Sequence, residues 1–498
     1  MLRSIGPRRV IWLIAGTALL AGCTTVGPNF RTPAAPGVAG YTRETLPTGT
    51  ASAPGALGAA QRFVPEASAP AEWWREFGSK RLDELVAQAL EHSPTLAAAE
   101  ATLRQAQHTY AAQAGSTLYP TLGAKLAASR NEADSSSTGQ RNATHNLYSL
   151  YNVGVAVNYN LDLFGGNRRA LEALAAQADY QGYQLAGARL TLAANIATTA
   201  FSQAQLAAQI QATQTILKAQ QDQLDIARKR FDLGASARPE VLALQTQVEQ
   251  ARATLPPLVN RLQQADHLLA ILVGQAPGAV DIPRFTLPEF RLPVSLPVVV
   301  PSELVRQRPD IQASAALLHV ATAQYGVAVA DLYPQINLSA NLGTQALTIG
   351  GLFGPGTLVW TLAGQLAQPL FNAGLESATN AAEASLQAAG ANYRQTVLQA
   401  LRNVADALRA LDNDAQALAA QSTADASAQE SLKLAEQQYE LGASSYLQLL
   451  IAQQQAQQTR VGLIGVQAQR LADSAALYQA MGGGTLAVAG ANGIARTE

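Results

Sequence analysis

Two long stretches without proline dominate this chain, and both run into nearly the same turn. The first covers residues 167–233 and leads into RFDLGAS (230–236), and the second covers 375–441 and leads into QYELGAS (438–444). Ala, Gln and Leu, all strong helix formers, predominate in both. Glycine is the usual helix stop because it adopts the left-handed conformation at little cost. Each stretch is therefore predicted to be one helix of roughly 100 Å. This is several times longer than the average helix, which has about a dozen residues.

Apolar residues recur in heptads along both predicted helices. In the second helix the register runs from Val397 to Tyr439, with Asp425 as its polar exception, and in the first it slips by four residues before Ile210. These narrow, Ala-padded seams predict close packing against several neighbours and leave broad polar faces. A fibrous coiled-coil rod is the alternative, and the strands described next count against it.

The segment YNVGVAVNYNLDL (151–163) alternates strictly between apolar and small or polar residues. A period of two over this length favours a membrane strand, although a soluble sandwich strand also alternates over a shorter distance. Tyr151 and Tyr159 share the apolar face about 26 Å apart, close to the spacing of the aromatic girdles of outer-membrane barrels.

Four such strands are predicted, two in each half of the chain. They lie at about 118–129, 150–164, 333–345 and 358–370, the polar loop 131–146 separates the first two, and Trp360 of the last is a further girdle candidate. Four strands cannot close a barrel, and lipid offers no partner for an open sheet edge. Three copies would supply twelve strands around an interior too wide for side chains to fill. The predicted fold is mainly α, with an internal two-fold repeat: a trimeric twelve-stranded β-barrel continued by a long α-helical barrel.

The N-terminus has the layout of a bacterial export signal. Three arginines precede a short apolar run, and Leu-Ala-Gly then leads to Cys23, the only cysteine. This arrangement resembles a lipobox, so Cys23 is expected to carry a covalent lipid; an ordinary signal peptide that contains a Cys is the alternative. Thr24 follows where an Asp would be the usual signal for inner-membrane retention, which points to the outer membrane.

Proline and glycine clusters suggest the domain boundaries. We assign a signal peptide to 1–22, a lipidated extension to 23–72, a first repeat to 73–275, an equatorial linker to 276–301, a second repeat to 302–481 and a flexible tail to 482–498. The repeats each hold a pair of strands, the long helix (167–233 or 375–441) and a return helix. Pro256 and Pro257 are assigned, together with the segment 277–301, to the link between the halves.

Composition and motifs argue against several function classes. Net charge is −1 and charged residues make up 14%, without the basic patch of a nucleic-acid surface. The five histidines lack metal-ligand spacing, and there is no nucleophile elbow or phosphate loop. We therefore expect no enzyme activity, catalytic residue, metal or cofactor, apart from the lipid on Cys23.

The chain resembles the TolC and OprM family of outer-membrane channels, in the lipoprotein branch that serves resistance-nodulation-division (RND) efflux pumps. The resemblance rests on TxxGPxF after the lipobox, DLFGGNRR at 162–169, QRPDI at 307–311 and the two LGAS turns. It implies a homotrimer in the outer membrane with a helical tunnel across the periplasm, a periplasmic adaptor (membrane fusion) protein and an inner-membrane RND pump.

The resemblance also implies that the two turns form the periplasmic aperture and contact the adaptor. The residues concerned are Phe231, Asp232, Leu233, Gly234, Tyr439, Glu440, Leu441 and Gly442. Better-studied relatives follow the Tyr with an Arg and two Asp residues that help to close the aperture. Ser444, Gln448 and Ile451 stand in those positions here, so that network does not carry over, and closure would depend on apolar contacts.

The expected function is a passive exit duct for drugs or other small molecules, with the energy supplied by the inner-membrane pump. A duct for type I protein secretion is one alternative. A trimeric surface stalk or adhesin is another, although such proteins place the barrel at one chain end, whereas strands interrupt both halves of this chain.

Overall fold

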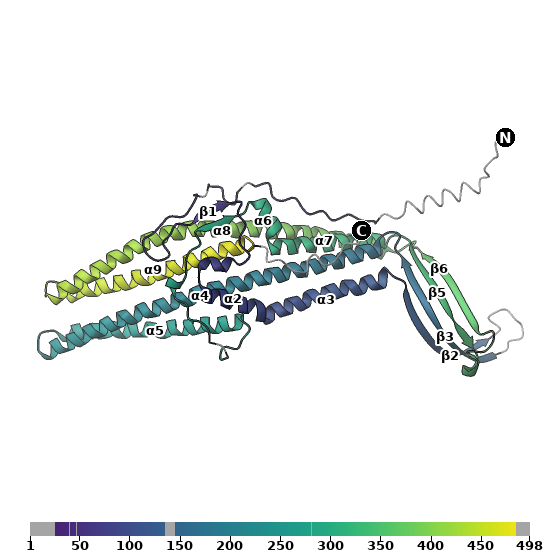
Figure 1. Cartoon of the computed structure of the whole chain (residues 1–498), viewed down its shortest axis with the longest axis horizontal. Coiled ribbons are helices and arrows are strands. Elements are labelled where there is room, and N and C mark those ends of the chain that lie inside the picture. Colours follow the sequence, from purple (N-terminus) through teal and green to yellow (C-terminus); the bar gives the residue numbers. More distant parts are fainter. Residues whose placement is uncertain (1–24, 39, 46, 135–144, 280, 485–498) are drawn as a thin grey trace, which may run out of the picture. The chain divides into compact units, whose positions relative to one another are not determined.

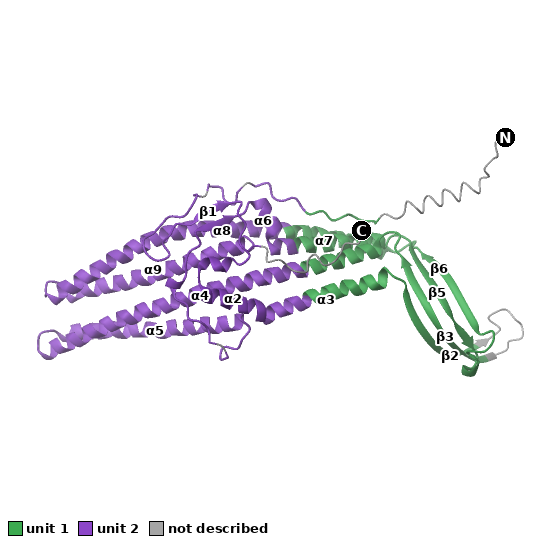
Figure 2. Ribbon diagram, in the orientation of Figure 1, with its two compact units in different colours: residues 1–32, 103–180, 314–393 green, residues 33–102, 181–313, 394–498 purple. Residues whose placement is uncertain are grey.

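The computed structural model describes residues 25–38, 40–45, 47–134, 145–279 and 281–484. The predicted signal peptide, the lipidation site Cys23 and most of the predicted tail lie outside these residues. Two compact units make up the chain. One contains 103–180 and 314–393 with the N-terminus up to Thr32, and the other contains 33–102, 181–313 and 394–498 (Figure 2). Each unit thus combines segments from both halves of the chain, and the predicted domain boundaries remain a prediction.

The first unit contains an antiparallel sheet of four strands, β2 (Thr121–Asp134), β3 (His145–Leu161), β5 (Gln335–Ala346) and β6 (Leu358–Ala367), with the 3₁₀ turn η4 (Ile349–Gly351) between the last two. The strand order is β2-β3-β5-β6 (Figure 1), so the predicted four strands per chain are confirmed. The predicted bounds of the polar loop, 131–146, are wrong at both ends, because Asn131–Asp134 pair with His145–Tyr148 as strand residues. This extension consists of two strands only, and backbone pairing there does not require an apolar face.

The pairing register gives this sheet one apolar and one polar face. Tyr151, Val153, Val155 and Val157 lie opposite Ala346, Thr344, Leu342 and Ala340, and the last two lie opposite Trp360 and Leu362. The intervening positions, Asn152, Gly154, Ala156 and Asn158, lie opposite Gln345, Gly343, Asn341 and Ser339. Directly opposite residues share a face. The apolar residues therefore gather on one side, where Leu126 is 77% and Leu362 75% exposed.

Two helices are far longer than the others. α4 spans Gly166–Asp232 and α8 spans Ala373–Glu440, against the predicted 167–233 and 375–441. Each is followed by a return helix, α5 (Arg238–Leu272) or α9 (Tyr446–Ala480). The other α-helices in the described residues are α2 (Lys80–His92), α3 (Pro94–Thr117), α6 (Pro301–Gln307) and α7 (Pro309–Ala330).

The prediction that Pro256 and Pro257 belong to the link between the halves is wrong, because both lie inside α5. A proline inside a helix removes a hydrogen bond and costs about 3 kcal/mol. α5 buries Leu244, Val248 and Ala251 before the prolines and four more residues after them. Packing on both sides of the prolines accounts for a continuous helix.

Aromatic residues form the core of the second unit. Trp73 of the 3₁₀ helix η1 (Trp73–Phe77) stacks on Tyr478 of α9, with centroids 5.6 Å apart. Phe77 packs on Phe201 of α4, which meets Phe290 edge-on. Close by in sequence, the 3₁₀ turn η3 (Leu287–Glu289) precedes β4 (Ser295–Val298), which pairs in parallel with β1 (Arg62–Pro65). The residues before α2 and those between α5 and α6 are thereby tied together.

Among the described helices, α7 alone is long and apolar enough to cross a membrane by length and composition. Half of its most apolar window is buried inside the protein, as expected of a core helix.

Candidate functional site

The two repeated turns have the same backbone structure. In the first, the Gly234 amide donates to the Phe231 carbonyl and the Ala235 amide to the Arg230 carbonyl. In the second, Gly442 donates to Tyr439 and Ala443 to Gln438. This pair of bonds defines a Schellman helix end with glycine in the left-handed region, and φ is +74° at Gly234 and +73° at Gly442. The repeated LGAS sequence is thus a repeated helix stop.

The turns present apolar and acidic side chains to the surface. Leu233 and Leu441 occupy matching positions, and each is 84% exposed. Asp232 and Glu440, just before them, are also exposed. A leucine this exposed at the end of a long helix has no packing role within its own chain, which makes both turns candidate contacts for a partner.

Tyr439, near the end of α8, is tied to the other helix pair. Its hydroxyl donates a hydrogen bond of 2.5 Å to Oε1 of Glu240 in the first turn of α5. The Arg230 guanidinium, near the end of α4, lies 5.7 Å from the centre of its ring. Tyr439 therefore holds a carboxylate with its hydroxyl and faces a cation with its ring.

A second layer of contacts lies further from the turns. Tyr446 of α9 packs edge-on against Tyr439 and donates to Oε1 of Gln247 at 3.2 Å. The Gln453 amide donates to Oε1 of Gln223 at 2.6 Å. Beneath these bonds Leu224 and Ala227 of α4 pack on Leu244 and Val248 of α5. We call the set Arg230, Glu240, Tyr439 and Tyr446 the tip latch, because it joins α4 and α5 to α8 and α9 of the same chain.

Burial and acidic neighbours keep the two tyrosines protonated. Burial, together with the hydrogen bond to Glu240 and against the opposing effect of Arg230, raises the pKa of Tyr439 to about 12. The pKa of Tyr446 is also raised to about 12, chiefly by burial. Both hydroxyls are thus hydrogen-bond donors at any physiological pH.

Of the residues proposed from sequence, the structure brings only Tyr439 into the tip latch. Glu240 and Tyr446 were not predicted, and their only signal is that each lies in the first turn of the helix after an LGAS turn. Ser444 and Gln448, which replace charged residues of the relatives, bond to each other at 2.7 Å. Gln448 also completes a capping box with Ser445 at the start of α9. Among the described residues no group of three His, Cys, Asp or Glu could hold a metal ion.

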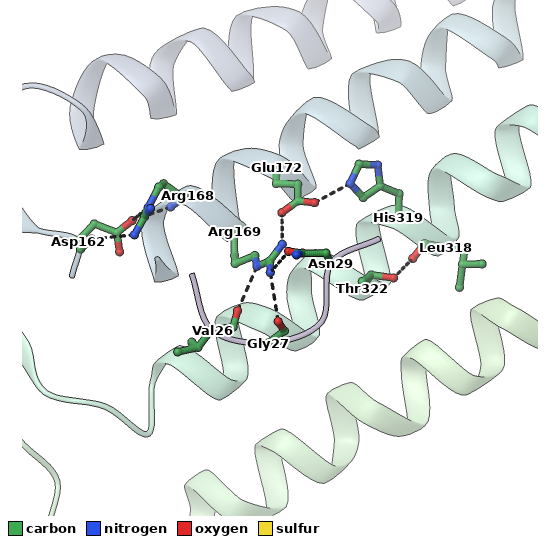
Figure 3. A network of polar contacts seen from close by, with 10 residues as sticks. All are labelled: Val26, Gly27, Asn29, Asp162, Arg168, Arg169, Glu172, Leu318, His319 and Thr322. Atoms are coloured by element: carbon green, nitrogen blue, oxygen red, sulfur yellow. Dashed lines mark hydrogen bonds and ion pairs between the residues drawn. The ribbon is translucent and has the colours of Figure 1, made fainter. Parts of the chain in front are cut away.

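A buried arginine anchors the N-terminal arm in the first unit (Figure 3). The side chain of Arg169 is 3% exposed, and it donates to the carbonyls of Val26 and Gly27 and to Oδ1 of Asn29. Glu172 accepts a bond of 2.7 Å from Arg169 and contacts Nε2 of His319 at 2.7 Å. The His319 ring stacks on Phe30 at 4.3 Å. The motif TxxGPxF therefore contacts Arg169 of the NRR motif through several hydrogen bonds. The hydrogen bond from His319 is the main cause that lowers the pKa of Glu172.

Arg470 similarly anchors a later part of the N-terminal segment in the second unit. It is fully buried and donates to the carbonyls of Leu57 and Ala59 and to Oγ1 of Thr50. Nearby, burial and the Asp473 carboxyl raise the pKa of Asp414 to about 7. The Asp414 carboxyl thus keeps its proton up to about neutral pH.

The three predicted girdle residues share the apolar face of the sheet. Tyr151 and Tyr159 lie opposite Ala346 and Leu338. Trp360, 73% exposed, lies opposite Leu342 in the row of Val155, midway between the two tyrosine rows. Membrane strands are tilted, so depth changes from strand to strand, and the girdle role of all three remains a prediction.

Comparisons with known proteins identify the family. A family model described as "Outer membrane efflux protein" matches residues 85–275 and 300–483. The solvent efflux pump outer membrane protein SrpC of Pseudomonas putida is 30% identical over 94% of this chain and 96% of its own. The pyoverdine export outer membrane protein OpmQ of the same species is 31% identical over 83% and 88%. The solved structure of the outer-membrane channel OprN matches with a TM-score of 0.82 and 25% identity, covering 93% of this chain and 99% of that one. The chain therefore belongs to the outer membrane efflux protein family: it is a channel component of a bacterial efflux pump, located in the outer membrane with its helical part in the periplasm.

Proposed function

We propose that three copies of this chain join their sheets into one twelve-stranded barrel and form a passive exit duct. The proposal depends on two features of the sheet, its unpaired edges and its apolar face. Among the described residues the outer edges of β2 and β6 have no partner strand, and one face of the four-stranded part of the sheet is mainly apolar. Lipid cannot satisfy open backbone edges, so β6 of one copy must pair with β2 of the next.

A water-filled lumen requires more than two copies. Eight strands is about the smallest membrane barrel and leaves an interior that side chains fill. Twelve strands leave an aqueous lumen lined by the polar face, with Asn152, Asn158 and Asn341 among its residues. Solutes would pass through this lumen without a chemical step in this chain, and the inner-membrane pump would supply the energy.

The two LGAS turns are proposed to form the periplasmic aperture and the adaptor contact. Six turns would meet in a trimer, with Asp232 and Glu440 as rings of carboxylates that attract cations. The exposed Leu233 and Leu441 offer the adaptor an apolar contact. The tip latch holds the two helix pairs of each chain together, and we propose that its release widens the aperture.

Lipidation of Cys23 and the partners complete the proposal. The lipid would place the arm that begins at Val26 at the membrane surface, and Arg169 anchors this arm. The relatives are named for efflux of solvents and for pyoverdine export, so we propose small molecules as substrates, delivered through an adaptor by an inner-membrane pump of the RND type.

The test is the assembly of the detergent-extracted, full-length protein. We expect native mass spectrometry to give three chains and electron microscopy to show a hollow barrel continued by a hollow cylinder. A compact monomer without a pore would contradict the proposal, and a thin solid stalk would support an adhesin instead.

A further inference from the structure

Charge is almost absent from the part of the sheet in which all four strands lie side by side. In the segments 121–129, 150–161, 335–346 and 358–367, the single Asp, Glu, Lys, Arg or His residue is Lys125. A charged side chain within the membrane depth is expensive on the lipid face and, where it occurs, usually faces water or a pathway. The role of Lys125 therefore depends on which face of the sheet carries its side chain.

The register places Lys125 on the polar face. It lies opposite Gly154 of β3, which lies opposite Gly343 of β5, which in turn lies opposite Val359 of β6. We call these four residues the Lys125 row. Asn152, Asn341 and Thr361 occupy neighbouring positions on the same face.

The two glycines leave the space beside Lys125 open. A Cβ atom at Gly154 would lie 2.8 Å from the Leu342 carbonyl oxygen, and one at Gly343 would lie 2.5 Å from that of Val153. The strands are thus too close for any larger residue here. A hollow of about 140 Å³ lies at this row, and Lys125, Asn152, Asn341 and Thr361 are among its lining residues. An exposed ammonium group therefore stands beside amide and hydroxyl groups with room for a solute.

Lys125 has no ion-pair partner among the described residues of the sheet. None of the ion pairs found among the described residues involves it. The nearest acid on β2, Glu132, is about 23 Å further along the strand and alternates onto the opposite face. A neighbouring copy would place its β6 beside β2, and β6 contains no acid.

We propose that the Lys125 row is a selectivity site for anionic solutes in the outer-membrane part of the channel. The inference rests on the trimer proposed above, in which three Lys125 ammonium groups encircle the lumen at one level. This ring attracts small anions and carboxylate-bearing molecules, while Asn152, Asn341 and Thr361 offer hydrogen bonds to their uncharged parts. Cations favoured by the carboxylates at the aperture would thus be repelled by a positively charged ring before they leave.

The test is the reversal potential of single channels in a KCl gradient across a planar bilayer. We expect Lys125→Gln to lower the chloride-to-potassium permeability ratio about two- to threefold, as loss of a charge several Å from the ion in water would, and Lys125→Glu to lower it further. Lys125→Arg should keep the wild-type ratio. The matched control is Arg130→Gln, which removes a positive charge five residues along β2, where the alternation places it on the other face.

Two failures can be told apart. If wild type and variants conduct with the same reversal potential, the Lys125 proposal is wrong and the channel stands. If none of them conducts, although all insert as heat-stable oligomers, the proposed duct itself is contradicted, and with it the inference that depends on the duct.

Discussion

The hydroxyl of Tyr439 donates a 2.5 Å hydrogen bond to the Glu240 carboxylate, although 199 residues separate the two in sequence. This bond joins the end of α8 to the start of α5. Both residues lie close to an LGAS helix stop, where we propose the periplasmic aperture.

Tyr439→Phe should favour the open aperture. The substitution removes the donor and keeps the ring, and a hydrogen bond to a charged group contributes about 1.5 kcal/mol or more, which corresponds to roughly a tenfold higher open probability. Single-channel recordings in planar bilayers measure this probability. Tyr110→Phe is the control, since its hydroxyl has no hydrogen bond among those found in the described part of the chain. Equal open probabilities in all three proteins would remove Tyr439 from the gate.

Arg169→Met should release the N-terminal arm. It breaks three hydrogen bonds to the arm and leaves carbonyls unsatisfied, at a cost of about 1–3 kcal/mol each where they stay buried. Hydrogen exchange of residues 25–32 should become faster, and proteases should cut there. Arg168→Met is the control, because Arg168 is half-exposed and pairs with Asp162 instead. Unchanged protection in Arg169→Met would show that other contacts hold the arm.

Trp360→Lys should impair assembly in the membrane far more than Thr361→Lys. The two residues are neighbours on β6 that lie on opposite faces of the sheet. Trp360 lies in the row midway between those of Tyr151 and Tyr159. A lysine that faces lipid costs about 2–4 kcal/mol at the bilayer midplane and about 0–1 kcal/mol at the interfaces, whereas a lumen-facing lysine costs little. The yield of heat-stable oligomer from outer membranes measures the difference. If the two variants lose oligomer to the same degree, the assignment of the faces is wrong.

Asp414→Asn should stabilise the protein at alkaline pH and lose this advantage in acid. The pKa of Asp414 is raised from its ordinary value of 3.8 to about 7, so its contribution to stability is complete below pH 3.8 and is lost as the pH rises through 7. Asparagine keeps the neutral form at every pH. We expect a gain of about 1 kcal/mol at pH 8, reduced for solvent screening of a half-exposed group.

Thermal unfolding of both proteins at pH 5 and pH 8 measures that gain. Asp412→Asn, two residues away on α8, serves as the control. A stability difference that does not depend on pH would contradict the raised pKa of Asp414.

Features with a local cause were predictable from the sequence. The alternation over 151–163 required one apolar and one polar face, and the register of β3 with β5 has that arrangement. Gly234 and Gly442 end their helices as expected. The family and the four strands per chain were correctly predicted for the same reason: each depends on periodicities or short motifs that neighbouring residues set.

Features that depend on distant partners were not predictable. The prolines at 256 and 257 predict a link between the halves, since no local signal shows that packing on both sides holds α5 together. In the sequence, Glu240 is simply an acid in the first turn of a helix, and Lys125 is simply one lysine in a strand, so neither position indicates its contacts.

The sequence by itself determined the periodicities, the helix stops and the need for a partner at two open sheet edges, because backbone geometry and solvation act over a few residues. Only the tertiary structure decided that Tyr439 meets Glu240, that Arg169 holds the arm, and that Lys125 stands beside two glycines. Those contacts join segments far apart in the chain, and their geometry exists only once the helices have packed and the strands have paired.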